Sequence, residues 1–106
     1  MGDLFQSYQA IKLALSYDVH HAESYNNLAV LELKKGNISD AKYNFNIAMK
    51  ESQYLYEPAF NAALLAFKTM EYQESYALIN KALGVYPDHY ESQELKKTLD
   101  DILVIL

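Results

Sequence analysis

The side chains best able to perform acid–base or metal chemistry are three histidines. His20 and His21 are adjacent, so they point in different directions on any regular element, and His89 stands far along the chain. A metal site needs ligands that converge on one point, usually from closely spaced positions. The spacing therefore argues against a metal site, and we interpret His20 and His21 as part of a solvated turn.

A small acidic group near the end of the sequence is the second candidate for chemistry. Glu94, Asp100 and Asp101 belong to a polar helix face and lack the apolar surroundings that tune a general acid. The chain also carries no nucleophile-elbow motif and no glycine-rich phosphate loop. We therefore expect neither an enzyme nor a bound cofactor in this chain.

Composition narrows the classes of protein further. The 106 residues are 51% hydrophobic, carry a net charge of −5 and include no cysteine, which excludes a disulfide framework and a thiolate metal site. The nine basic residues are scattered, whereas nucleic-acid binding needs a clustered basic face. The longest apolar run, residues 102–106, is too short to cross a bilayer. We expect a cytoplasmic protein that binds no nucleic acid and does not insert directly into a membrane.

The sequence repeats itself with a period of 34 residues. Ala14, Ala48 and Ala82 are equivalent positions at this spacing. Three more columns share it: Leu15, Met49 and Leu83; Ile11, Phe45 and Ile79; Ser7, Ala41 and Ser75. Within each copy the apolar and small residues recur at intervals of three and four, which is typical of one face of a helix. A fixed period of this length indicates a helical repeat protein.

The pattern predicts six helices and an all-α fold. The expected helices are Leu4–Tyr17, Ala22–Lys35, Ile38–Met49, Pro58–Thr69, Tyr72–Tyr86 and Tyr90–Ile105. They form a helix-turn-helix solenoid of about two and a half repeats: a half repeat at 2–21, repeats at 22–55 and 56–89, and a C-terminal capping helix at 90–106. Asn37 is expected to cap the helix that follows it. One apolar stripe of the last helix contains Leu95, Leu99, Ile102 and Leu106.

The repeat resembles the tetratricopeptide repeat (TPR) family, whose period is 34 residues. The matching residues of the middle copy are Tyr25, Leu28, Ala29, Gly36, Ala41, Phe45 and Ala48. Glu32 and Gln53 depart from the pattern, since the family usually has an aromatic residue and a proline there. The resemblance implies a TPR solenoid that binds proteins.

Longer stretches resemble the C-terminal repeats of the TPR subunits of the BBSome, the Bardet–Biedl syndrome protein complex. These are residues 21–32, 56–61 and 86–89. This resemblance implies a non-catalytic scaffold in a ciliary trafficking coat, located at the cilium or ciliary base, with other complex subunits or cargo peptides as partners. It also implies that the chain is a fragment of a longer protein. The alternatives are a stand-alone peptide-binding adaptor of cochaperone type, or a TPR appendage of a larger enzyme.

In TPR proteins the first helix of each pair faces a concave groove, and this predicts the binding residues. The expected groove residues are Asn26, Val30, Leu33, Lys34, Phe60, Leu64, Phe67 and Lys68. Such a groove is apolar with a basic rim and suits an amphipathic helix or an extended apolar segment. The same apolar stripe could instead pack internally. Asn26 and Val30 replace the Lys and Asn of chaperone-binding TPRs, which argues against that function.

The first helix is expected to mediate self-association. It has the pattern of a second repeat helix without the first helix of its pair, so its stripe of Leu4, Ile11 and Leu15 lacks a partner surface. Uncapped ends of solenoids expose apolar surface. We therefore expect a homodimer with two-fold symmetry.

Overall fold

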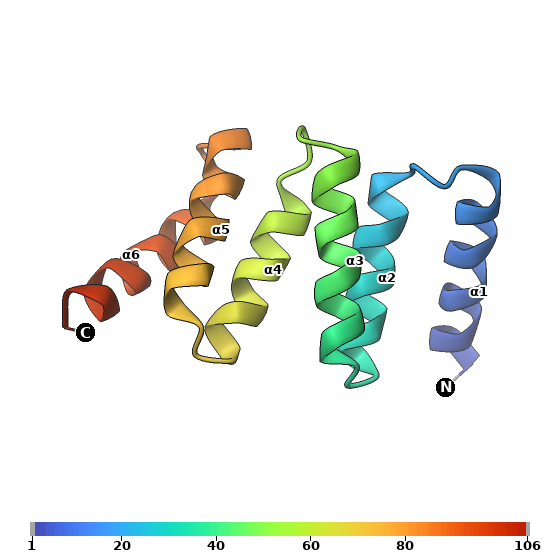
Figure 1. The fold of residues 1–106 in the computed structure, drawn as a ribbon, viewed down its shortest axis with the longest axis horizontal. Helices are drawn as coiled ribbons and strands as arrows, with labels where there is room; N and C mark the ends of the chain where they lie inside the picture. The colour runs from blue at the N-terminus through green and yellow to red at the C-terminus, as the bar shows by residue number, and fades with distance from the viewer. Residues whose placement is uncertain (1, 106) are drawn as a thin grey trace. The chain divides into compact units, whose positions relative to one another are not determined.

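A computed structural model describes residues 2–105 and contains six α-helices (Figure 1). They are α1 (Gly2–Tyr17), α2 (Ala22–Lys34), α3 (Ile38–Glu51), α4 (Glu57–Lys68), α5 (Tyr72–Val85) and α6 (Tyr90–Ile105). No strand occurs in this part of the chain. The all-α, TPR-like architecture of about two and a half repeats and a final helix is thus confirmed, whereas the repeat boundaries stay predictions.

The helices form two compact units that divide after Ser52. The first unit contains α1, α2 and α3, and the second, from Gln53 onwards, contains α4, α5 and α6. Each unit is a tight helix pair with one further helix beside it. No helix within residues 2–105 is both long and apolar enough to span a membrane.

The α2–α3 pair packs through small residues that let the two backbones approach closely. Ala29 of α2 and Ala41, Phe45 and Ala48 of α3 have no exposed surface. Phe45 is the one large side chain among these four, so it fills the space that the alanines leave. Ala41, Phe45 and Ala48 belong to three of the columns that the 34-residue period identifies.

The turn between α2 and α3 depends on a glycine. Gly36 has φ +84°, in the left-handed region that residues with a Cβ rarely adopt. The Asn37 N–H donates to the Glu32 carbonyl (2.8 Å), which closes the end of α2.

Asn37 does not cap α3 through its side chain, contrary to expectation. Its Nδ2 instead donates to Oε2 of Glu32 at 2.8 Å. Glu32 is only 6% exposed, and its other carboxylate oxygen lies 3.8 Å from Nζ of Lys35. A buried carboxylate needs such partners. These contacts explain how the repeat accepts Glu32 where the family usually has an aromatic residue.

The α4–α5 pair repeats this design with two changes. Ser75 replaces the equivalent Ala41, and its hydroxyl donates to the Ala63 carbonyl at 2.8 Å, tying α5 to α4. At the turn Met70, with φ +64°, takes the left-handed position of Gly36. The Glu71 N–H donates to the Ala66 carbonyl (2.8 Å), so the helix end closes as it does after α2.

The helices that lie beside the two pairs, α1 and α6, differ in how many of their side chains are buried. In α6, Ser92 and Leu99 are fully buried, and Leu95 and Ile102 of the predicted stripe are half-buried. Leu106 lies outside the described residues. In α1, none of residues 3–17 is buried. The helix nearest the N-terminus therefore contributes least to the core.

Candidate protein-binding surfaces

The expected groove residues of α2 lie on a partly open face. Asn26, Val30 and Leu33 are half-buried, and Lys34 is exposed in the last turn. Of these residues, Val30 lines a cleft between α1 and α2, which pack against each other. The partial exposure of Asn26, Val30 and Leu33 and the exposure of Lys34 leave surface that a ligand can contact in this unit.

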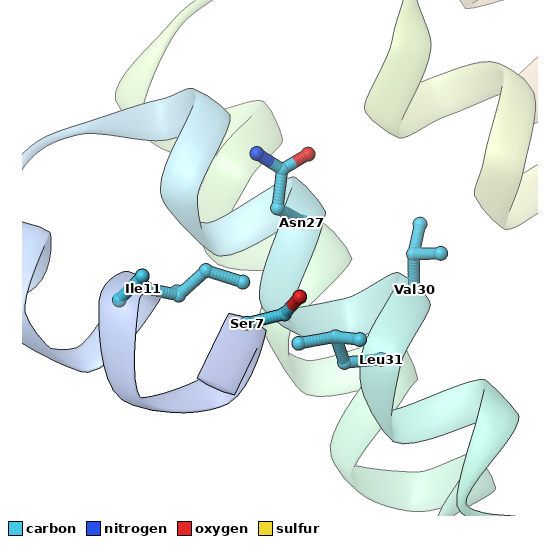
Figure 2. A pocket seen from close by; sticks show the side chains of 6 residues that line it. Ser7, Ile11, Asn27, Val30 and Leu31 are labelled. Carbon is cyan, nitrogen blue, oxygen red and sulfur yellow. The ribbon is translucent and has the colours of Figure 1, made fainter. Parts of the chain in front are cut away.

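The first cleft has a volume of about 390 Å³ and lies between α1 and α2 (Figure 2). Ser7, Ala10, Ile11, Asn27, Val30 and Leu31 line it. Figure 2 shows Ile11 of α1 and Leu31 of α2 pointing into the space between the helices. The structure thus brings Ile11, predicted for self-association, together with Val30, predicted for the groove.

A second cleft of about 420 Å³ also lies between α1 and α2. It is lined by Leu4, Phe5, Tyr8, Gln9, Leu31 and Lys35. Nζ of Lys35 lies 4.5 Å from the centre of the Tyr8 ring, a cation–π distance. Leu4 is 37% exposed, and Leu15 of the same predicted stripe is half-buried. Leu4 and Ile11 of this stripe thus line clefts against α2, and the self-association of the stripe stays a prediction.

Two of the expected groove residues of α4, Phe60 and Phe67, have ring partners within their own unit. The Phe60 ring lies 4.8 Å from the His89 ring in an edge-on arrangement, and the Phe67 ring lies 5.6 Å from Tyr72. Leu64 is half-buried and Lys68 is exposed. The two phenylalanines therefore stabilise the unit, which makes Leu64 and Lys68 the better probes of ligand contact on α4.

His89 is the residue whose role the sequence reasoning missed. It is 9% exposed, and its ring also lies 4.5 Å from Tyr56. Nδ1 is 2.6 Å from Oγ of Ser92, and Nε2 is 3.7 Å from Oε1 of Glu91. Burial raises the pKa of the Tyr56 phenol, and the negative charge of Glu57 raises it further by a smaller amount. The cluster anchors the start of α6 against α4.

A signal for this cluster exists in the sequence. His21 and Ser24 have the same spacing and the same Nδ1–Oγ distance of 2.6 Å at the start of α2. The His-x-x-Ser pattern therefore marks the start of two equivalent helices. His20, by contrast, pairs with Glu51 through Nδ1 and Oε2 at 2.9 Å across its unit, so the two neighbouring histidines do act separately.

The acidic residues near the end of the chain hold structural contacts. Asp100 accepts a hydrogen bond from the Tyr76 hydroxyl, and this bond is the main cause of the raised pKa of Tyr76. Oε2 of Glu94 lies 3.3 Å from Nζ of Lys97. Among the residues the structure describes, no three His, Cys, Asp or Glu side chains form a group that could hold a metal.

The comparisons with known proteins agree with the repeat interpretation. No family model matches the chain. It is 38% identical to tetratricopeptide repeat protein 8 of Mus musculus over 106 residues, which are 100% of this chain and 21% of that protein. It is 39% identical to tetratricopeptide repeat protein 8 of Homo sapiens over 99 residues, 93% of this chain and 18% of that protein. The chain thus spans about a fifth of the length of these relatives, and its resemblance to TPR proteins is confirmed.

Proposed function

We propose that this chain, similar over its whole length to tetratricopeptide repeat protein 8, is a non-catalytic scaffold that binds other proteins. The observation that carries the proposal is the open, largely apolar cleft in which Ile11, Val30 and Leu31 meet. A cleft with apolar walls and a polar rim suits an amphipathic helix or an extended apolar segment.

The binding contacts on α2 are proposed to be Asn26, Val30, Leu33 and Lys34. The half-burial of Val30 and Leu33 leaves apolar area for a ligand to cover, and the exposed Lys34 adds a positive charge at the end of the helix. On α4 the proposed contacts are Leu64 and Lys68, while Phe60 and Phe67 support them from within the unit.

The setting we propose is a ciliary trafficking complex that resembles the BBSome, with other subunits of that complex as partners and a location at the cilium or ciliary base. Its support is the resemblance of residues 21–32, 56–61 and 86–89 to BBSome TPR subunits, together with the identity to the mouse and human relatives. The name of the mouse and human relatives mentions only the tetratricopeptide repeat. The proposed ciliary setting therefore rests on the resemblance of the three stretches to BBSome subunits.

Affinity capture from ciliated-cell lysate tests the proposal, with BBSome subunits measured individually. The test variants are Val30→Asp on α2 and Leu64→Asp on α4, because a buried unpaired carboxylate in the contact strongly disfavours binding. The matched controls are Tyr43→Asp and Val85→Asp, which are 67% and 37% exposed on α3 and α5. Circular dichroism checks that all four variants are folded.

Each result has a separate meaning. The proposal is supported if the original chain and both controls capture BBSome subunits and Val30→Asp or Leu64→Asp loses them. This result would support the scaffold function, the proposed contact residues and the ciliary setting together. Capture that neither test variant weakens would disprove the proposed contacts. If no BBSome subunit is captured, the ciliary setting is wrong.

A further inference from the structure

The sulfur chemistry of this chain is limited to its methionines. The sequence contains no cysteine and three methionines, Met1, Met49 and Met70. Met1 lies outside the described residues, so the structure compares two thioethers. A peroxide converts a thioether to a polar sulfoxide, and methionine sulfoxide reductases reverse the change. Which methionine reacts first therefore depends on how well a peroxide reaches each sulfur.

The two described methionines differ greatly in exposure. Met49 of α3 is 8% exposed and belongs to the core of its unit. Met70 is 75% exposed and lies in the turn that joins α4 to α5 (Figure 1). A buried group meets a solvent reagent only when the fold opens locally, whereas an exposed group meets it directly. The folded chain therefore protects one thioether and presents the other.

The turn around Met70 is held by hydrogen bonds between main-chain groups. The Met70 N–H donates to the Phe67 carbonyl at 3.1 Å, and the Glu71 N–H donates to the Ala66 carbonyl at 2.8 Å. Neither bond uses the Met70 side chain. A chemical change at the sulfur therefore leaves the hydrogen bonds of the turn in place.

The turn itself does not require a long apolar side chain at position 70. Met70 has φ +64°, and this left-handed conformation is sterically costly for a residue with a Cβ. Gly36 holds the equivalent position, with φ +84°, in the turn between α2 and α3. The Met70 side chain thus adds a steric cost while most of its surface meets solvent. Its thioether is free to react without disturbing the core.

We propose that Met70 is a site of reversible oxidation by peroxides, at which the folded surface gains a polar sulfoxide. A sulfur lone pair attacks one oxygen of hydrogen peroxide, so an S–O bond forms and the O–O bond breaks. The proton of the transferred hydroxyl passes to the departing hydroxide, which leaves as water. The sulfur is oxidised by two electrons and the peroxide is reduced. Met70 follows Lys68, a proposed contact on α4, by two residues, but the inference does not depend on partner binding.

Peptide-mapping mass spectrometry after exposure to hydrogen peroxide measures each methionine separately. In the folded chain we expect Met70 to be oxidised at least about tenfold faster than Met49, because Met49 reacts only through opening of the fold. In denaturing guanidinium chloride the two rates should become equal, since exposure and not the local sequence causes the difference. Equal rates in the folded chain, or faster oxidation of Met49, would overturn the proposal.

A second experiment tests whether the fold tolerates the sulfoxide. Met49→Leu nearly conserves the core volume and isolates Met70, and the double variant Met49→Leu/Met70→Leu is the matched control. Peroxide should change the midpoint of thermal unfolding of Met49→Leu by at most about 4 °C relative to the control, because an exposed change costs little. A mixture of the two methionine sulfoxide reductases with dithiothreitol should then restore the thioether. Loss of helical circular dichroism in Met49→Leu alone, or a Met70 sulfoxide that the reductases leave unchanged, would contradict the proposal.

Discussion

The two units use the same helix pair but attach their third helix in different ways. In the second unit α6 is anchored by Leu99 in the core, by His89 among aromatic rings and by the Tyr76–Asp100 hydrogen bond. In the first unit α1 contributes no buried side chain from residues 3–17 and borders two clefts. A shared repeat pattern thus specifies the pair, while the attachment of a neighbouring helix depends on a few residues of its own.

The largest expected difference between the units comes from truncating one side chain in each third helix. Leu99 has no exposed surface, so Leu99→Ala should lower the free energy of unfolding by about 2–5 kcal/mol. Ile11 is half-buried beside an open cleft, and Ile11→Ala should cost about 1 kcal/mol or less. Urea unfolding followed by circular dichroism measures both. Equal losses would show that α1 is docked as firmly as α6.

The two His-x-x-Ser starts offer a matched comparison of smaller size. His89→Ala and His21→Ala remove the same Nδ1–Oγ interaction of 2.6 Å. Only His89 also loses contacts with the Tyr56 and Phe60 rings. We expect His89→Ala to be more destabilising by about 1–3 kcal/mol, because each of the two lost ring contacts contributes about 0.5–1.5 kcal/mol. Thermal or urea unfolding of both variants measures the difference, which would be absent if the rings contributed nothing.

The turns of the two pairs differ at one left-handed residue. Met70→Gly should raise the free energy of unfolding by about 0.5–1 kcal/mol, because glycine relieves the steric cost of φ +64°. Met70 is 75% exposed, so little packing is lost. Gly36→Ala should lower the free energy of unfolding by about 1–2 kcal/mol. Backbone strain alone causes this loss, since no atom lies within 4 Å of the added Cβ. A destabilising Met70→Gly, in the same unfolding assay, would contradict this account.

The smallest expected effect concerns alkaline pH and the α5–α6 contact. Because the Tyr76 pKa is raised in the folded state, the stabilisation is fully present below the ordinary tyrosine pKa of 10.0 and is lost as pH rises through the raised value. Tyr76→Phe should therefore lower the urea midpoint of unfolding at about pH 8. Between about pH 8 and about pH 11 the midpoint should then fall less in this variant than in the original chain. Tyr17→Phe, at an 85% exposed position, is the control and should follow the original chain.

Most of the helical layout could be predicted because local spacing and the repeat period determine it. Ala41, Phe45 and Ala48 recur at helical intervals, and the 34-residue register identifies their equivalents, so six helices follow without tertiary information. The site was harder to predict. Phe60 and Phe67 fit a groove face by register, but their contacts with His89 and Tyr72 depend on where other helices place those rings.

The sequence by itself determined the helix type, the pairing pattern and the resemblance to TPR proteins, because these depend on side-chain periodicity along one chain. Only the tertiary structure decided which polar residues are buried and which apolar ones remain exposed. The side chain of Asn37 donates to Glu32 instead of capping its helix, and Phe5 and Leu13 remain exposed although they are apolar. The physical reason is that burial and hydrogen-bond choice depend on the neighbours that surround a residue, and a linear pattern does not specify those neighbours.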